Sequence, residues 1–154
     1  MIRLAAPNDF ETLLEVREEV AIDLLQRGIP SNPNSLTRQH LVDWTSEGVL
    51  WVADLDGEVI GSIAVWFHDP TDYWPRADLA SYVRDLMVHP RLRHQGYGAL
   101  LLKWAERYSA GRGRNRVRLD CGNLRLGQAD FFAPASQGAL ADREDVHDFA
   151  IGPS

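Results

Sequence analysis

Cysteines and long apolar runs are nearly absent from this 154-residue chain. Its one cysteine, Cys121, cannot form a disulfide within the chain, which is typical of a protein in a reducing compartment. No apolar run approaches the roughly 20 residues that a membrane-spanning helix needs. The first residues lead directly into a structured pattern without a signal-peptide region. We therefore expect a cytoplasmic protein with no membrane partner.

Several familiar site patterns are missing as well. The five histidines lack the spacing of a metal site, so no metal is expected. A Gly-x-Gly sequence occurs without the third glycine of a Rossmann fingerprint and without the Lys-Ser/Thr of a P-loop. The Gly-x-Ser-x-Gly elbow of α/β-hydrolases does not occur. These absences exclude the commonest nucleotide-binding and hydrolytic folds.

Positive charge is scarce except in one segment. The chain carries a net charge of −6, yet residues 84–116 contain eight Lys or Arg and two Asp or Glu, a net +6, so the remainder carries −12. A basic island in an acidic chain predicts one local anionic ligand, because nucleic acids need a broad basic surface. We expect no nucleic-acid partner. The length predicts a single domain over residues 1–154.

Hydrophobic periodicity predicts the elements that follow one another along this domain. The expected order is β-α-α-β-β-β-α-β, with a further strand-like segment near the end. Strands are expected at 2–5, 49–55, 58–67, 79–88, 116–121 and 146–151, and helices at 10–27, at 35–47 and from Ala99 onward. Asp56-Gly57 predicts a tight hairpin between the second and third strands.

The segment from Arg93 to Ala99 carries the clearest functional signal. Gly96 and Gly98 have no Cβ, so the backbone there can come close to an anion. The first amides of the next helix have no partner within it and lie at the positive end of its dipole. Arg93 adds a permanent cation. The segment predicts a pyrophosphate site, against the alternative of solvated arginines and glycines that only form a turn.

The run VHPRLRHQGYG at 88–98 resembles the acyl-coenzyme-A loop of the GNAT (Gcn5-related) N-acetyltransferases. That family's signature, Arg/Gln-x-x-Gly-x-Gly/Ala after a strand ending in Val-x-Pro, is filled at every position. The resemblance implies an α/β (α+β) GNAT fold with acetyl-coenzyme A as cofactor. Its mixed central sheet is flanked by helices and splayed open at the strand before the glycine-rich loop. The implied cofactor-binding residues are Leu86, Met87, Val88, Arg93, His94, Gln95, Gly96, Tyr97, Gly98, Ala99 and Asn123.

The tail departs from the family pattern. A tyrosine that protonates the departing thiolate normally follows the position of Asn123, but here Asp130 stands there, or Phe131 if one residue is inserted. Asn123 itself could instead be a helix cap or turn residue. The family's Gly-Phe segment is missing, and 133–154 is small and polar. We expect the closing hairpin to be short, disordered or supplied by another subunit of a homodimer.

Acetyl transfer to an amine requires a polarised carbonyl, a base and a proton donor. The backbone N–H of Val88 is the candidate for the carbonyl oxygen. Asp85 and Asp120 are candidate bases, although either could be a surface charge paired with an arginine. Tyr82 is the candidate proton donor, or a core residue.

Two functions are compatible with these features. The first is an acetyl-coenzyme-A-dependent N-acetyltransferase whose acceptor is a small-molecule amine that attacks directly. The acceptor is expected to bind near the loop around Tyr73 and Trp74. The acids of this loop, Asp69, Asp72 and Asp78, would favour a cationic amine. Alternatively, the loop is acidic only because it is solvated. The alternative is a catalytically inactive protein of this fold that binds acyl-coenzyme A as a sensor or interaction module, as the missing tail tyrosine suggests.

Overall fold

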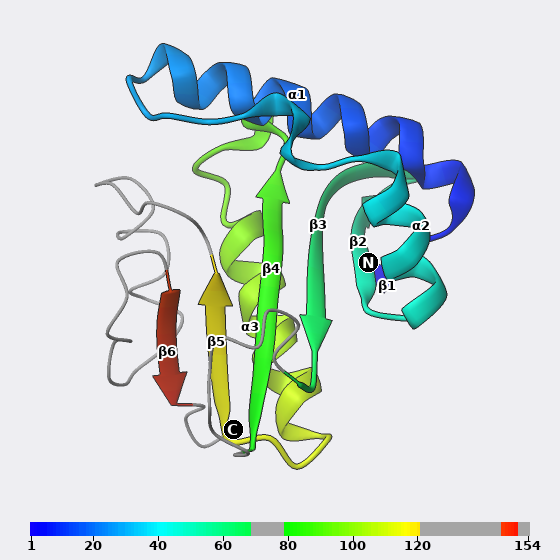
Figure 1. Cartoon of the computed structure of the whole chain (residues 1–154), viewed down its shortest axis with the longest axis vertical. Helices are drawn as coiled ribbons and strands as arrows, with labels where there is room; N and C mark the ends of the chain where they lie inside the picture. Colours follow the sequence, from blue (N-terminus) through cyan, green and yellow to red (C-terminus); the bar gives the residue numbers. More distant parts are fainter. Residues whose placement is uncertain (69–78, 121–145, 151–154) are drawn as a thin grey trace. The chain divides into compact units, whose positions relative to one another are not determined.

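The computed structural model describes residues 1–68, 79–120 and 146–150 (Figure 1). Hydrogen bonds join each strand to the next one along the chain, from β1 to β6. The elements are β1 (Ile2–Leu4), α1 (Phe10–Gln26), α2 (Arg38–Glu47), β2 (Leu50–Leu55), β3 (Glu58–Trp66), β4 (Ala80–Val88), α3 (Tyr97–Ala110), β5 (Arg116–Asp120) and β6 (Val146–Ala150). Within the described ranges, no helix has both the length and the apolar character needed to cross a membrane.

The chain forms two compact units that share strands β3 and β4. The first unit comprises Met1–Ala64 and Leu86–Gly98, and the second comprises Val65–Asp85 and the part of the chain from Ala99. Each is described separately below. The sequence-based expectation of one domain over 1–154 remains a prediction.

In the first unit, β1, β2 and β3 form an antiparallel ribbon. The turn between β2 and β3 confirms the hairpin prediction, because Asp56 and Gly57 both take left-handed conformations, with φ of 53° and 87°. Such a pair of positive φ angles matches the twist of the strands it joins. The side chains at the centre of this ribbon, Val52 and Ile63, are fully buried.

Helix α1 begins where the sequence predicted, because the chain before it is anchored by a buried carboxylate. Asp9 accepts hydrogen bonds from Arg3 Nη1 at 2.8 Å and Nη2 at 3.0 Å, and from the Ala6 amide at 2.8 Å. The Arg3 guanidinium holds the pKa of Asp9 below its ordinary value. The helix then buries Leu13 and Val16. This anchor fixes the end of α1 that follows β1.

Helix α2 starts three residues later than the sequence predicted. Leu36 is extended, and Thr37 is the N-cap, accepting a hydrogen bond from the His40 amide at 3.2 Å. The N-cap interaction satisfies an amide that has no partner within the helix, so it fixes the boundary at Arg38. Gly48, with φ of 71°, ends the helix as predicted.

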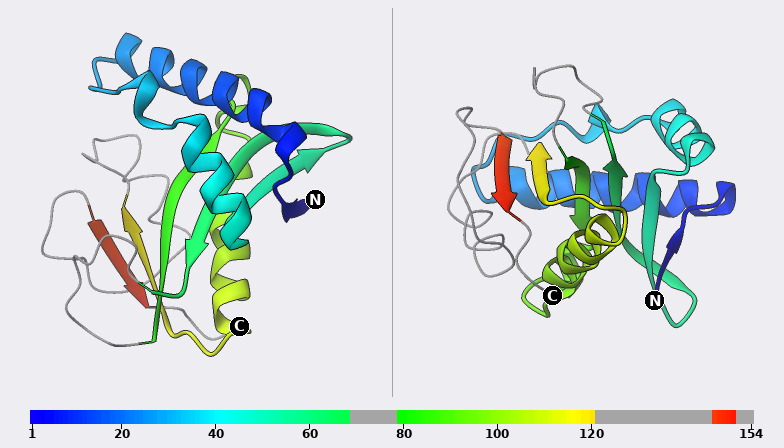
Figure 2. Two further views of the ribbon diagram at one scale, coloured as in Figure 1. Left: turned by 45° about the vertical axis from the view of Figure 1, so that its right-hand side comes forward. Right: turned by 90° about the horizontal axis from the view of Figure 1, so that it is seen from below.

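In the second unit, β5 lies between β4 and β6. It pairs in parallel with β4 and antiparallel with β6. Figure 2 shows α3 covering one face of the β4–β5 pair. The strand predicted at 146–151 is confirmed over Val146–Ala150, and residue 151 lies outside the described ranges. This chain itself therefore supplies the neighbour of β5. A homodimer remains a prediction.

The buried face of α3 differs slightly from the sequence-based expectation. Leu101, Leu102 and Ala105 are fully buried, whereas Leu100 is 55% exposed. The helical spacing of the sequence predicts that Trp104 and Tyr108 share one face with Leu100. In the structure, these two rings stack on each other with centroids 5.0 Å apart. The hydrophobic stripe is therefore shifted by one position, because the two large rings pack together along the edge of the helix.

Glu106 on α3 provides a test of this packing. Burial raises the pKa of its carboxyl, an effect that the charge of Lys103 opposes. No described residue hydrogen-bonds its buried Oε1. A raised carboxyl pKa stabilises the fold below the ordinary Glu range, and this stability is lost as the pH rises through the folded-state pKa. Glu106→Gln should therefore raise Tm by about 1–2 °C at pH 8 and leave it unchanged at pH 3.5. Thermal melts at both pH values test this, and a lower Tm at pH 8 would contradict it.

Candidate functional site

Strand β4 changes course at Asp85. Among the described residues, its pairing with β5 ends at Val83, which lies opposite Leu119, although β4 continues to Val88. Asp85 has φ of 54°, a left-handed conformation in the middle of a strand. Such a conformation is strained for any residue with a side chain, and aspartate tolerates it better than most. The sheet is thus splayed where β4 leads toward the glycine-rich loop, in agreement with the expected fold.

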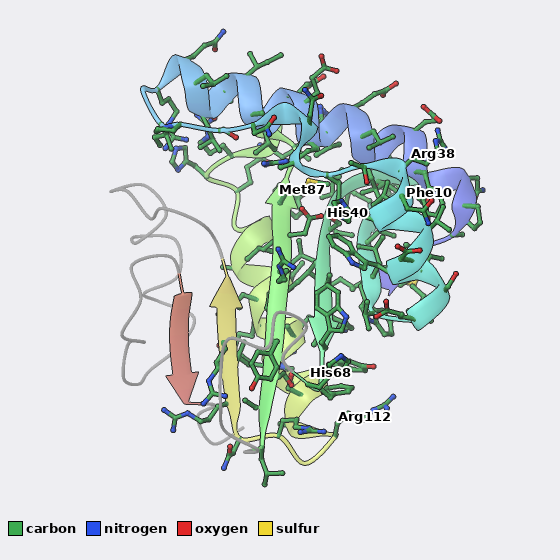
Figure 3. All side chains as sticks on the ribbon, in the orientation of Figure 1. Phe10, Arg38, His40, His68, Met87 and Arg112 are labelled. Atoms are coloured by element: carbon green, nitrogen blue, oxygen red, sulfur yellow. The ribbon has the colours of Figure 1, made fainter. Side chains whose placement is uncertain are left out.

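Beyond this kink, the main chain of β4 lies directly against β3. A Cβ added to Gly61 would collide with the Met87 carbonyl oxygen and lie 3.2 Å from Val88 Cα. The His89 amide donates to the Ile60 carbonyl oxygen at 2.7 Å. The Met87 side chain is buried, and Figure 3 shows it at the end of β4. Glycine at position 61 therefore permits the close approach that fixes the candidate backbone edge at 86–88.

The loop after β4 presents its main chain to solvent. A short turn, Pro90–Leu92, leads to His94 and Gly96, which take left-handed conformations with φ of 63° and 84°. Arg93, His94, Gln95 and Gly96 are all exposed. A Cβ added to Gly96 would meet nothing within 4 Å.

Helix α3 starts at Tyr97, two residues before the predicted Ala99. Within the described ranges, no side chain accepts a hydrogen bond from the amides of residues 94–98. Amides at the start of a helix are donors that lack an intrahelical acceptor. An anion such as a diphosphate fits here, because residues 94–96 are exposed and space is open beside Gly96.

Three basic side chains in and beside this loop each contact an acid within the first unit. His89 Nε2 lies 2.8 Å from Glu19 Oε2 on α1. Arg91 pairs with Glu58 on β3. Arg93, expected to be a cation at the mouth of the loop, pairs with Asp23 on α1. Alternate residues of the loop are thus tethered to α1 and β3, which the sequence did not indicate. Figures 1 and 2 show α1 crossing this end of β4.

In the second unit, Tyr82 lies beside a buried arginine. Tyr82 and Arg118 are direct partners in the β4–β5 ladder. Arg118 Nη1 donates to Tyr82 Oη at 2.9 Å, and the two side chains are only 1% and 6% exposed. The alternation of β5 assigned Arg118 correctly to the face opposite Val117 and Leu119. It did not reveal that both faces are covered. The register also places Asp148 of β6 opposite Arg118.

The structure describes the remaining candidates to different extents. Asp85 is half-buried at the kink. Asp120 is the last residue of β5, and its side chain lies outside the description. Asn123 and the residues expected near the acceptor also lie outside the described ranges. These are Asp69, Asp72, Tyr73, Trp74 and Asp78. Asp130 and Phe131, the alternative residues for the family's tyrosine position, lie outside the described ranges as well.

Comparison with known protein families identifies the family of this chain. The family model described as "Acetyltransferase (GNAT) family" matches residues 18–134. The chain belongs to the GNAT acetyltransferase family. GNAT enzymes use acetyl-coenzyme A. No curated protein sequence matches the chain.

Solved structures agree on the GNAT fold. The PaiA N-acetyltransferase from Thermoplasma acidophilum, in complex with coenzyme A, superposes with a TM-score of 0.76 at 21% identity, covering 97% of this chain and 98% of that one. A GNAT-family acetyltransferase from Listeria monocytogenes 4b F2365 gives a TM-score of 0.79 at 14% identity, covering 97% of this chain and 92% of that one. N-acetylglutamate synthase from Neisseria gonorrhoeae, complexed with coenzyme A and N-acetyl-glutamate, gives a TM-score of 0.68 at 18% identity. The match covers 99% of this chain and 35% of that one.

Proposed function

We propose that this protein is an acetyl-coenzyme-A-dependent N-acetyltransferase that acts on the amine of a small molecule. The observation that carries the proposal is the exposed loop at 93–96, whose left-handed His94 and Gly96 precede the first amides of α3. Membership of the GNAT family supports acetyl transfer in general. The proposal goes beyond family membership in naming a small molecule as the acetyl acceptor.

Two stretches of main chain would hold the cofactor. The amides of 93–99 would bind the diphosphate, with the charge of Arg93 beside them. The backbone of Leu86, Met87 and Val88, beyond the splay of β4, would pair with the pantetheine arm, and Asn123 would contact the cofactor further along. When bound, acetyl-coenzyme A supplies an activated thioester. The close packing of Gly61 on β4 supports this assignment, because it makes the strand edge rigid.

Three groups are proposed to handle the reacting oxygen and the protons. The Val88 N–H would hold the thioester carbonyl oxygen. Asp85 or Asp120 would remove a proton from the acceptor ammonium, directly or through water. Tyr82 would return a proton to the leaving thiolate, and the neighbouring Arg118 would stabilise the charge left on the phenol oxygen.

A kinetic test distinguishes proton donation by Tyr82 from a purely structural role in the core. Tyr82→Phe should lower kcat by about 100-fold and leave the affinity for coenzyme A unchanged, because only a proton donor is removed. Tyr108→Phe, on α3, is the matched control and should keep wild-type kcat. Steady-state kinetics with both variants test this. A wild-type kcat in Tyr82→Phe, with only a lower Tm, would assign Tyr82 to the core instead.

The nature of the acceptor is proposed from the sequence, whose acids at 69, 72 and 78 favour a cationic amine. Thiol release from acetyl-coenzyme A, measured over polyamines, amino acids, aminoglycosides and peptides, tests the function. The proposal predicts release with at least one small amine. Release with peptides alone would contradict the acceptor class. Binding of coenzyme A without release would favour the sensor, which the absence of any tyrosine after Tyr108 supports.

A further inference from the structure

Helix α1 and the cofactor loop share one carboxylate. Asp23 on α1 pairs with Arg93 in the loop. The same Oδ2 atom lies 3.4 Å from Arg27 Nη1, one turn further along α1. The Asp23 side chain is 24% exposed and that of Arg93 is 35% exposed, so neither charge is fully screened by water. The carboxylate is therefore held between two guanidinium groups.

This ion pair competes with the ligand that the loop would bind. A diphosphate and a carboxylate both take hydrogen bonds from a guanidinium in the same planar, fork-like geometry. Asp23 also places a negative charge next to the proposed diphosphate site. An anion entering the loop must therefore draw Arg93 away from Asp23 or share it against the repulsion of a carboxylate.

We propose that Asp23 is a positioning residue that sets the affinity for coenzyme A by competing with its diphosphate for Arg93. This inference rests on the proposed function. In the free protein, Asp23 holds Arg93 against α1. When the diphosphate binds, Arg93 moves to it, and Asp23 keeps Arg27 as its counter-ion. The exchange leaves no carboxylate unpaired, which makes it reversible at modest cost.

The rest of the loop is restrained independently of Asp23. Glu19, one turn before Asp23 on α1, contacts His89, and Glu58 on β3 contacts Arg91. These contacts hold the turn between β4 and α3 while Arg93 changes partner. Removal of the Asp23 charge should therefore alter the position of one side chain and leave the course of the loop unchanged.

The test is titration calorimetry of coenzyme A with wild type and Asp23→Asn. Asparagine keeps the shape of the side chain and removes its charge. We expect coenzyme A to bind Asp23→Asn about threefold to tenfold more tightly. Glu18→Gln, an exposed carboxylate on α1 with no ion pair among the described residues, is the matched control and should bind as wild type does. In an Arg93→Gln background, the gain from adding Asp23→Asn should be much smaller, because only the repulsion between the carboxylate and the diphosphate is then removed.

The direction of the change distinguishes competition from a structural role. A damaged loop weakens binding, so a gain in affinity cannot come from misfolding. Unchanged or weaker binding in Asp23→Asn would overturn the inference, as would an equal gain in Glu18→Gln or an undiminished gain without Arg93. If wild type itself binds no coenzyme A, the proposed function fails. If wild type binds and Asp23→Asn does not differ from it, only this inference fails.

Discussion

Replacement of Gly61 by alanine should both destabilise the protein and impair the cofactor site. The new Cβ would collide with the Met87 carbonyl oxygen and approach Val88 Cα to 3.2 Å. Both neighbours are main-chain atoms of β4, so neither can rotate away. Overpacking of this kind costs about 1–3 kcal/mol of the free energy of unfolding. Because β4 must shift exactly where its backbone is proposed to bind cofactor, turnover should fall about 100-fold.

The matched control is Gly111→Ala, at the end of α3. A Cβ there would lie 3.5 Å from the Arg107 carbonyl oxygen and 3.6 Å from that of Tyr108, which are ordinary contacts. Its free energy of unfolding should stay within about 0.5 kcal/mol of wild type. Chemical denaturation and steady-state kinetics measure both effects. A stable, fully active Gly61→Ala variant would show that β4 does not need its close approach to β3.

Replacement of Arg118 by methionine should give the other large loss of stability. Arg118 is buried, and its Nη1 donates to Tyr82 Oη at 2.9 Å. Methionine fills a similar length and cannot donate a hydrogen bond. A buried hydroxyl oxygen that loses its donor costs about 1–3 kcal/mol, so the free energy of unfolding should fall by about 2–3 kcal/mol.

The double variant Tyr82→Phe/Arg118→Met identifies the cause of that loss. Removal of both polar partners leaves neither end of this hydrogen bond unsatisfied, so the double variant should be more stable than Arg118→Met alone. Urea denaturation of wild type, both single variants and the double variant completes the cycle. Strictly additive losses would mean that the Tyr82–Arg118 hydrogen bond does not contribute to stability.

The sequence predicted most of the fold because the elements have strong local signals. Alternating apolar residues mark the strands, and Gly28 and Gly48 end the first two helices at left-handed positions. The order of the elements and the glycine-rich loop were sufficient to indicate the family. The boundaries that moved most are the starts of α2 and α3, where capping and the first turn decide the start by a few residues.

The features that the sequence did not reveal depend on tertiary contacts. The left-handed Asp85 has no local signal, because aspartate is also common in ordinary turns. The pairing of Arg93 with Asp23 requires α1 to lie beside a loop that is distant in the chain. The burial of Arg118 requires cover on the second face of the sheet, which periodicity along one strand cannot indicate.

The claim on which the account rests is that the main chain at 93–99 binds the diphosphate of coenzyme A. Titration calorimetry of the wild-type protein with coenzyme A, compared with pantetheine, which lacks the diphosphate, tests it directly. The account predicts saturable one-site binding of coenzyme A and no detectable binding of pantetheine. An absence of heat with coenzyme A, or equal affinity for the two compounds, would contradict it.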